Sequence, residues 1–200
     1  MISLTPDSGV SILGWEFIRN GGGCMTRKIE IDPIVEALES MPYGLYIIGS
    51  HGPDNINGMM ADWVMQVSFS PRLVAVSLER NSTTLRNLRE SGFFTVNMLA
   101  ADQRGLAVKF CQPRQASKIV GRSEVASAAV YDKMAGVPYQ MGALTDCPIL
   151  DEGLAYLECA VDQLVEAGDH TLAVGRVLDG GVLREGEPLT QRILGWSYAG

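Results

Sequence analysis

Apolar and polar residues follow one another along this chain with the short period of β-strands. Runs of β-branched and aromatic residues, or strict alternation, predict strands over residues 43–50, 59–68, 73–78 and 93–99. The pattern returns at Leu154 and again over residues 170–181, and a last apolar run covers residues 191–196. About six strands without repeated strand–helix alternation indicate an antiparallel barrel rather than a parallel α/β sheet.

Short helices are expected between these strands. Asp32 is placed to cap a helix that begins at Pro33 and ends near residue 39. A second helix, with Leu85 and Leu88 on its inner face, should end at Gly92. A third would be capped by Asp102 and buried through Leu106 and Phe110, with Val108 flanking.

Turn-forming residues predict how the strands connect. Residues 51–58 end in Asn57-Gly58, a strong hairpin signal, so strands 43–50 and 59–68 are expected to pair. Residues 70–72 (SPR) and 167–169 (AGD) should form two further turns. Residues 112–142 have a weak pattern that indicates an irregular excursion with one helix near residues 125–134.

The first 24 residues have no sustained periodicity and end in three glycines. Met25 then opens a more regular segment. We therefore expect residues 1–24 to be a loosely ordered extension, or a start assigned too early, and residues 25–200 to form one domain.

Composition limits the classes of partner. The chain has 16 basic and 23 acidic residues, a net charge of −7, which disfavours nucleic acid and anionic membranes. No apolar run reaches the roughly 18 residues that span a bilayer, and the N-terminus lacks a secretion signal, so a cytoplasmic protein is expected. The four scattered cysteines are then expected to be reduced thiols, mostly buried.

Several common catalytic motifs are absent from the sequence. Neither the dinucleotide fingerprint G-x-G-x-x-G nor a P-loop occurs, and two histidines with unpaired cysteines make a metal site improbable. A hydrolytic triad from Ser50, Asp169 and His170 could be drawn, but Ser50 is not in a G-x-S-x-G turn.

Polar residues crowd the entrance of the second helix. The first turn of a helix presents free N–H groups and the positive end of the macrodipole, both of which attract phosphate. An arginine and four residues with hydroxyl or amide side chains stand there: Arg80, Asn81, Ser82, Thr83 and Thr84. The simpler interpretation is a well-capped helix, which needs only one of these residues.

The expected strand 59–68 carries polar residues that a buried strand does not need. Asp62, Gln66 and Ser68 would share one face with Met60, and Trp63 would take the other. Such a face suits a flavin, whose ring packs while its polar edge finds hydrogen bonds; an edge strand with one wet face is the alternative. His170, at the head of its strand, is either an exposed turn histidine or a polar group near the reacting ring.

Motifs in order along residues 41–196 resemble those of the flavin reductase-like proteins with an FMN-binding split barrel. They are Pro42-x-Gly44, Asn57-Gly58-Met59-Met60-Ala61-Asp62, Gln66-Val67-Ser68-Phe69-Ser70-Pro71, Asn81-Ser82-Thr83-Thr84, Arg89-Glu90-Ser91-Gly92-x-Phe94-x-Val96-Asn97-x-Leu99, Cys147-Pro148-Ile149-Leu150, Leu157-Glu158-Cys159, Gly168-Asp169-His170 and Gly175-x-Val177. The resemblance implies a homodimeric, mainly β, six-stranded antiparallel Greek-key split barrel with short helices that binds FMN or FAD.

The resemblance also implies roles for individual residues. The segment Met60, Ala61, Asp62 and Trp63 would lie along the flavin ring, and the segment Asn81–Thr84 at the phosphate. The histidine that matches His170 lies near the ring or the nicotinamide in several members. This chain departs from the family's common motif at Met60, Asp62, Trp63 and Gln66, in a variant similar to domains that serve rubredoxins or diiron modules.

The expected function is NAD(P)H:flavin reductase activity, with hydride transfer from NAD(P)H to bound FMN. Backbone N–H groups near Ala61 and Asp62 and the Gln66 amide are candidates to stabilise charge on the reduced ring. An ionised Asp62 facing that ring would oppose reduction, unless it points elsewhere, binds the flavin N3–H or lowers the potential. Two alternatives are an FMN-binding electron carrier for a rubredoxin, diiron or monooxygenase partner, and a split barrel that holds another cofactor.

Overall fold

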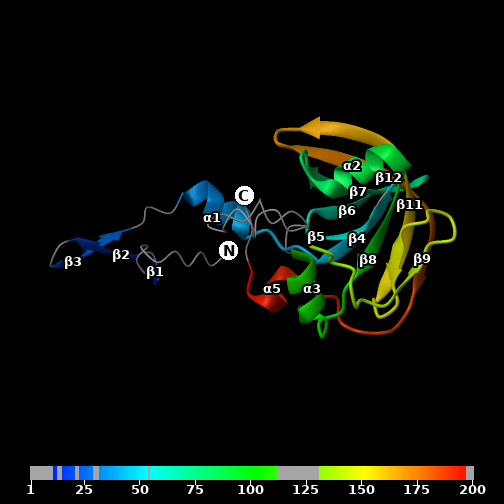
Figure 1. Ribbon diagram of the computed structural model, residues 1–200. Coiled ribbons are helices and arrows are strands. Elements are labelled where there is room, and N and C mark those ends of the chain that lie inside the picture. The colour runs from blue at the N-terminus through cyan, green and yellow to red at the C-terminus, as the bar shows by residue number, and fades with distance from the viewer. Residues whose placement is uncertain are drawn as a thin grey trace. The chain divides into compact units, whose positions relative to one another are not determined.

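One seven-stranded antiparallel sheet organises residues 42–196 (Figure 1). This computed structural model describes residues 32–53, 55–111 and 131–196, with the backbone alone of residues 11–12, 15–20 and 23–28. The sheet has the strand order β5-β4-β8-β11-β12-β7-β6. Its strands are β4 (Tyr46–Gly52), β5 (Asn55–Ala61), β6 (Val64–Phe69), β7 (Arg72–Glu79), β8 (Phe93–Met98), β11 (Ala155–Ala167) and β12 (His170–Val182).

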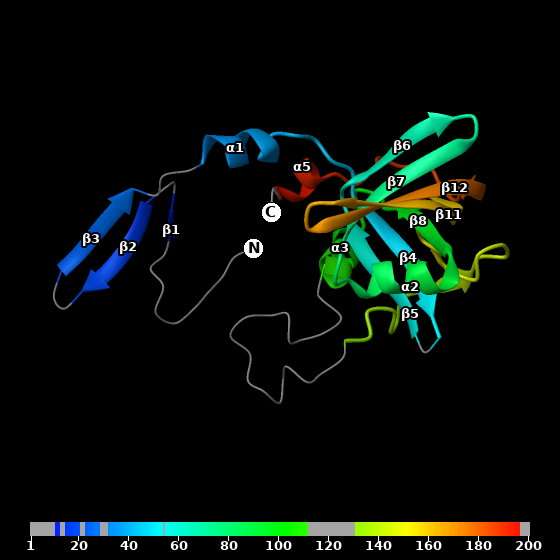
Figure 2. The ribbon, with the colours of Figure 1, turned by 90° about the horizontal axis from the view of Figure 1, so that it is seen from above.

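Three hairpins build the sheet, and two connections join strands that are not neighbours in it: β5 to β6, at the two opposite edges, and β7 to β8. β4 pairs with β5, β6 with β7, and β11 with β12, all antiparallel. The chain then leaves β7 through α2 (Thr83–Ser91) and returns as β8, which lies between β4 and β11. Figure 2 shows the curved sheet from above, with α2 on one side and the β6–β7 hairpin projecting from the other. The expected mainly β, antiparallel architecture with short helices is confirmed.

The strand count differs from the expected six because one predicted strand is two. The segment 59–68 is divided at Asp62 and Trp63, so β5 ends at Ala61 and β6 begins at Val64. The last run, residues 191–196, contains the short helix α5 (Gln191–Leu194). Two three-residue strands, β9 (Tyr139–Met141) and β10 (Pro148–Leu150), form a separate antiparallel pair.

The predicted hairpin turn at Asn57-Gly58 was wrong, although β4 and β5 do pair. Both residues lie inside β5, where Asn57 faces Ser50 and Gly58 faces Gly49. Asn57 is buried, and its amide donates a hydrogen bond to the Thr84 hydroxyl on α2 (3.0 Å). A glycine is needed at position 58 because a β-carbon there would lie 2.4 Å from the Phe110 ring.

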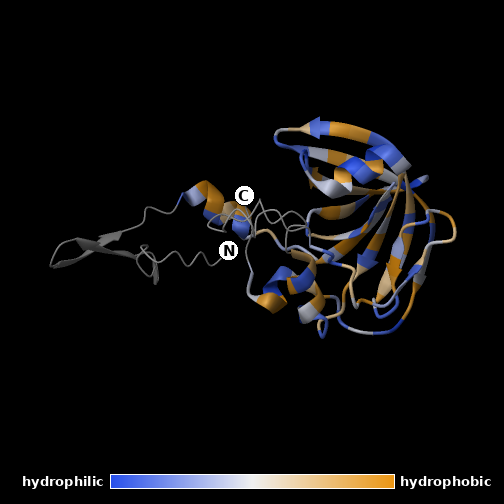
Figure 3. Ribbon diagram, in the orientation of Figure 1, coloured by the Kyte–Doolittle hydropathy of each residue, from blue (hydrophilic) through white to orange (hydrophobic). Residues whose placement is uncertain are grey.

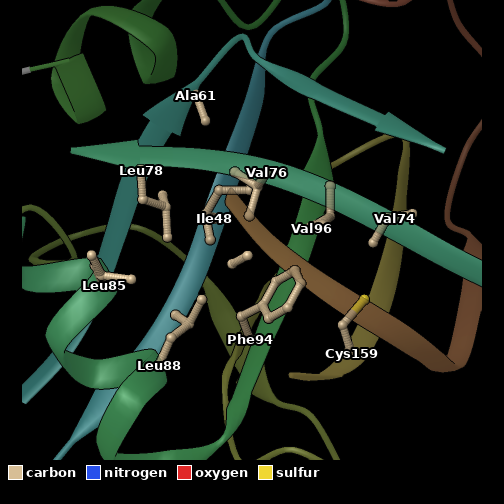
Figure 4. Packing of buried hydrophobic residues seen from close by; sticks show 11 residues of the cluster. Ile48, Ala61, Val74, Val76, Leu78, Leu85, Leu88, Phe94, Val96 and Cys159 are labelled. Carbon is tan, nitrogen blue, oxygen red and sulfur yellow. The ribbon is translucent and has the colours of Figure 1, made fainter. Parts of the chain in front are cut away.

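The strands and α2 enclose an apolar core (Figure 4). Figure 3 shows that hydrophobic and hydrophilic residues alternate along the strands, as a sheet with one buried face requires. Leu85 and Leu88 of α2 pack against Ile48, Phe94 and Val76 from three strands. Burying each such side chain stabilises the fold by about 1.5–3 kcal/mol.

A second core lies under α3 (Arg104–Cys111) and α5. Ala107 and Phe110 face inward as expected, with Leu106 partly buried and Val108 exposed. The predicted cap at Asp102 was wrong: its carboxylate pairs with Arg184 (2.7 Å).

The other two helix predictions were correct. In α1 (Pro33–Glu39) the Asp32 carboxylate accepts a hydrogen bond from the Ile34 N–H. Helix α2 ends at Gly92, whose φ of 76° is the left-handed conformation that glycine adopts without strain.

Residues 1–41 and 197–200 form a unit distinct from Pro42–Trp196. Its strands β1 (Ser11–Ile12), β2 (Trp15–Asn20) and β3 (Gly23–Lys28) pair antiparallel. The expected boundary at Met25 falls within β3, and the extension remains a prediction. The helix expected at residues 125–134 lies largely outside the described residues, and residues 131–134 are irregular.

The side chains of three of the four cysteines are described, and all three are free thiols. Cys147 and Cys159 are fully buried, and burial raises the pKa of each to about 12. Cys111 is exposed, so two of these three thiols are buried, in agreement with the expectation of mostly buried cysteines. None of the described helices is long and apolar enough to cross a bilayer.

We predict that Gly58→Ala lowers the free energy of unfolding by about 1–3 kcal/mol, because the new methyl group would collide with Phe110. Urea denaturation measures this change. Gly105→Ala on α3 is the matched control: its β-carbon would meet no atom within 4 Å, so it should leave stability unchanged or raise it by up to about 1 kcal/mol. Equal losses in the two variants would contradict this account.

Candidate functional site

The break between β5 and β6 is held in place by backbone hydrogen bonds. The Val64 N–H donates to the Asp62 carbonyl (2.9 Å), which turns the chain sharply. The Ser77 N–H donates to the Trp63 carbonyl (3.0 Å), which fastens the turn to β7. Sequence alternation therefore does not continue through this segment, and Asp62 does not share a strand face with Gln66.

Trp63 and His170 meet beside this break. Their ring centroids lie 5.1 Å apart, with the ring planes tilted by 49°. His170 begins β12, and its Nδ1 lies 2.7 Å from the carboxylate of Asp169. Its side chain is only 15% exposed, so it is not the exposed turn histidine of the simpler interpretation. Its hydrogen bond to Asp169 holds the pKa of that carboxyl below its usual range.

Asp62 points toward the C-terminal helix α5. Its carboxylate accepts a hydrogen bond from the side-chain amide of Gln191 (2.5 Å). Partial burial raises the pKa of Asp62, and this hydrogen bond opposes the rise. Gln191 was not predicted to belong to the site, because it is 129 residues away in sequence and no motif marks it.

The entrance of α2 lies next to the turn that carries His170. The Arg80 N–H donates to the Asp169 carbonyl (3.2 Å), and β7 and β12 are paired up to Glu79 and His170. An open depression lies here, lined by Glu79, Arg80, Asn81, Gly168 and Asp169. The structure therefore brings the predicted ring-binding and phosphate-binding segments to one end of the sheet.

Two of the hydroxyls predicted at the phosphate have structural bonds. Ser82 caps α2 by accepting a hydrogen bond from the Leu85 N–H (3.2 Å), which leaves its own O–H hydrogen available as a donor. Thr84 is buried and bonded to Asn57, so it faces the core rather than the depression. Thr83 is half-buried and Asn81 is exposed at the helix entrance.

The Arg80 side chain is paired with Glu166, on the β11–β12 hairpin. Arg80 Nε lies 2.9 Å from one carboxylate oxygen of Glu166, and Arg89 Nη2 lies 3.2 Å from the other. Figure 1 shows α2 beside the projecting end of this hairpin. Glu166 was also missed by the sequence analysis, since it is one of several polar residues that alternate along a strand.

Gln66 and Ser68 lie farther from this end of the sheet. Gln66 faces Val74 across the β6–β7 ladder, five residues or roughly 17 Å along β7 from Glu79, the partner of His170. Its amide donates to the carbonyl of Ser68 (3.1 Å). These two residues are therefore not brought together with Trp63 and His170.

Met60 and Ala61 complete the predicted segment. Ala61 is buried in the first core, and Met60 packs against the second. Any ligand beside them would meet mainly their backbone.

The hydrolytic triad is not assembled. Ser50 is fully buried and accepts a hydrogen bond from Asn87, whereas Asp169 and His170 lie at a hairpin turn.

Comparison with known proteins shows the family and the fold of this chain. The model of the flavin reductase-like domain matches residues 38–193. A ferric-chelate reductase (NAD(P)H) from Archaeoglobus fulgidus is 31% identical over 157 residues, which are 78% of this chain and 85% of that protein. A high molecular weight rubredoxin from Moorella thermoacetica is 32% identical over 155 residues, but this chain spans only 62% of its length.

Solved structures show the same fold. BorF, the flavin reductase component of a bacterial two-component tryptophan halogenase, aligns with a TM-score of 0.64 at 27% identity, over 80% of this chain and 92% of that one. The split barrel expected from the sequence motifs is confirmed by this likeness. With its family match over most of the chain, this protein belongs to the flavin reductase-like family.

Proposed function

We propose that this protein is an NAD(P)H-dependent flavin reductase. It binds FMN at the end of the sheet where Trp63, His170 and Arg80 lie. The observation that carries the proposal is the continuity of these groups. Trp63 contacts His170, and Asp169 bonds both the His170 side chain and the Arg80 backbone. An aromatic surface thus continues into a cationic helix entrance, as a ring system with a phosphate tail requires.

The residues present fit a flavin. Flavin, when bound, supplies a ring that takes up a hydride from NAD(P)H and passes electrons on. Trp63 and His170 would bound the ring, while Arg80, the Ser82 hydroxyl and the first N–H groups of α2 would face the phosphate. The bond from Asp169 to His170 Nδ1 orients the imidazole and leaves Nε2 to face a bound molecule. The choice of FMN over FAD rests on the resemblance of the sequence motifs.

The Asp62 side chain is bonded to Gln191 and is therefore not among the groups that would bind the flavin. Its hydrogen bond to Gln191 supports the option in which the carboxylate points elsewhere than at the flavin's polar edge. Because the Gln66 amide bonds the Ser68 carbonyl at a distance from His170, backbone N–H groups near Ala61 and Asp62 remain the candidates for stabilising charge on the reduced ring.

A second candidate function is electron transfer to a protein partner without nicotinamide turnover. The similarity to a high molecular weight rubredoxin favours it, since that name describes an iron–sulfur electron carrier. BorF is described as the flavin reductase component of a two-component halogenase. A chain with such a role would also deliver electrons to a second protein.

A homodimer is part of the proposal. β6 lies at an edge of the sheet and carries three exposed apolar side chains at alternate positions, Met65, Val67 and Phe69. Phe69 is 87% exposed. Edge strands with several exposed apolar side chains are normally covered, so we infer that a second copy of the chain packs along this edge.

Purified protein mixed with FMN should show a bound-flavin absorption band, and anaerobic stopped-flow mixing with NADH or NADPH should bleach it. His170→Gln should slow the bleaching about tenfold, because it disturbs the positioning of the reactants. His51→Gln, at the other histidine beside Cys147, is the control and should leave the rate unchanged. Failure to take up FMN would contradict the proposal, and uptake without bleaching would favour the electron carrier.

Asp62→Asn should stabilise the protein at pH 7. A pKa raised in the folded state means that the carboxyl favours folding when protonated and loses that contribution as pH rises through the folded pKa. The thermal midpoint should therefore rise by about 1–2 °C at pH 7, a small gain because the carboxyl is partly exposed. The difference should shrink toward pH 4.

Asp102→Asn is the control of opposite sign for this pH series. The Arg184 guanidinium holds the pKa of Asp102 below its usual range, so this variant should be less stable at pH 7 and equal to the parent in acid. A loss of stability at pH 7 in Asp62→Asn would refute the account of that carboxyl.

Phe69→Glu should convert the dimer to a monomer at micromolar concentration, because it places a charge at the most exposed apolar residue of the β6 edge. Analytical ultracentrifugation measures the mass. Val182→Glu, at an equally exposed apolar residue (80%) on β12, should remain dimeric. A wild-type monomer, or dissociation of both variants alike, would show that β6 is not the interface.

A further inference from the structure

Glu166 joins two arginines at the entrance of the proposed phosphate site. Its two carboxylate oxygens lie 2.9 Å from Arg80 Nε and 3.2 Å from Arg89 Nη2. The Thr171 hydroxyl, opposite it in the β11–β12 hairpin, donates to the carboxylate as well (3.3 Å). The mechanism proposed above uses Arg80 but assigns no role to Glu166.

We propose that Glu166 is a resident competitor for the phosphate of FMN and thereby determines how tightly the protein holds its flavin. The inference rests on the proposed function. A carboxylate and a phosphate monoester bind a guanidinium through the same N–H donors. Since Glu166 occupies the Arg80 Nε donor, a phosphate can take that donor only when Glu166 releases it.

The exposure of the pair makes this exchange feasible. The side chains of Arg80 and Glu166 are 51% and 54% exposed, so water replaces the lost contacts at little cost. A deeply buried pair would instead keep Arg80 permanently occupied. Glu166 also retains Arg89 and Thr171 as partners after it releases Arg80, so it does not become an isolated charge.

Charge adds to the competition. Arg80 and Arg89 bring two positive charges, which Glu166 reduces to one, and Asp169 beside the same depression opposes an incoming dianion. FMN would then be held weakly enough to exchange, which suits flavin that leaves after reduction rather than a permanently bound group.

The alternative is that Glu166 has a purely structural role. Glu166 also fastens the β11–β12 hairpin to α2 through Arg89, so its removal could loosen the site as a whole. Loosening would weaken FMN and riboflavin alike, because both carry the same ring. Competition for phosphate would change FMN alone, so the ratio of the two dissociation constants distinguishes the two roles.

The test compares wild type, Glu166→Gln, Arg80→Ala and the double variant by flavin fluorescence titration with FMN and riboflavin. Calorimetric titrations use inorganic phosphate and adenosine 2′,5′-bisphosphate. Glu166→Gln should tighten FMN about three- to tenfold and leave riboflavin within about twofold. Arg80→Ala should weaken FMN about tenfold or more with little change in riboflavin. In the double variant the gain from Glu166→Gln should disappear, because it acts through Arg80.

Glu90→Gln is the matched control. It also removes one negative charge, at a residue of α2, but Glu90 forms no ion pair with the described part of the chain. It should shift FMN less than twofold.

Equal changes for FMN and riboflavin in Glu166→Gln, or a gain that persists without Arg80, would overturn the proposal. A gain for adenosine 2′,5′-bisphosphate but not for FMN would overturn its assignment to the flavin phosphate. If Glu166→Gln binds inorganic phosphate more tightly than wild type, and the double variant loses that gain, competition for phosphate is supported even when wild type binds no flavin. Absence of flavin binding would count against the proposed function alone.

Discussion

The register between β7 and β12 is the constraint on which the candidate site depends. Pairing runs from Leu73 and Arg176 to Glu79 and His170, and the Arg80–Asp169 backbone bond closes it. Because side chains alternate between the two faces of a strand, a shift of one residue would turn His170 to the opposite face. The same register brings the hairpin turn against the entrance of α2. The groups that we propose to face the flavin ring and its phosphate therefore share one end of the sheet for a reason of backbone geometry.

The break at Asp62 and Trp63 is the second feature that shapes this site. An uninterrupted strand would place Trp63 by alternation alone, whereas the turn lets its carbonyl bond β7 and its ring meet His170. The same turn directs Asp62 toward Gln191 on the C-terminal helix. A segment near the end of the chain thus supports the site, although it contributes no residue that the family motifs mark.

Electrostatics at this site are balanced rather than strongly positive. Arg80 is already paired with the Glu166 carboxylate, and the exposed Asp169 carboxylate is bonded to His170. In a protein of net charge −7, an anionic cofactor is not attracted from a distance. Local donors must then supply its binding, which makes the partners of Arg80 more important than the total charge.

Local signals predicted those elements whose conformation depends on neighbouring residues. The cap at Asp32, the left-handed Gly92 and the alternating strands β11 and β12 all formed as expected, because each depends on a few adjacent side chains and backbone groups. The turn predicted at Asn57-Gly58 did not form, for the opposite reason. Its turn propensity was outweighed by burial against Phe110 and a bond to Thr84, which are distant in sequence.

The sequence was thus sufficient for the family and the antiparallel barrel. It also singled out the segments around Trp63, Arg80 and His170, which the structure brings to one end of the sheet. It did not reveal which side chains of those segments are free to meet a ligand. Thr84 is bonded to Asn57 in the core, and Gln66 lies along the far part of a hairpin. Glu166 and Gln191 lie at the site although no sequence motif marks them. These assignments depend on pairing between strands and on contacts across 27 to 129 residues, which no local pattern encodes.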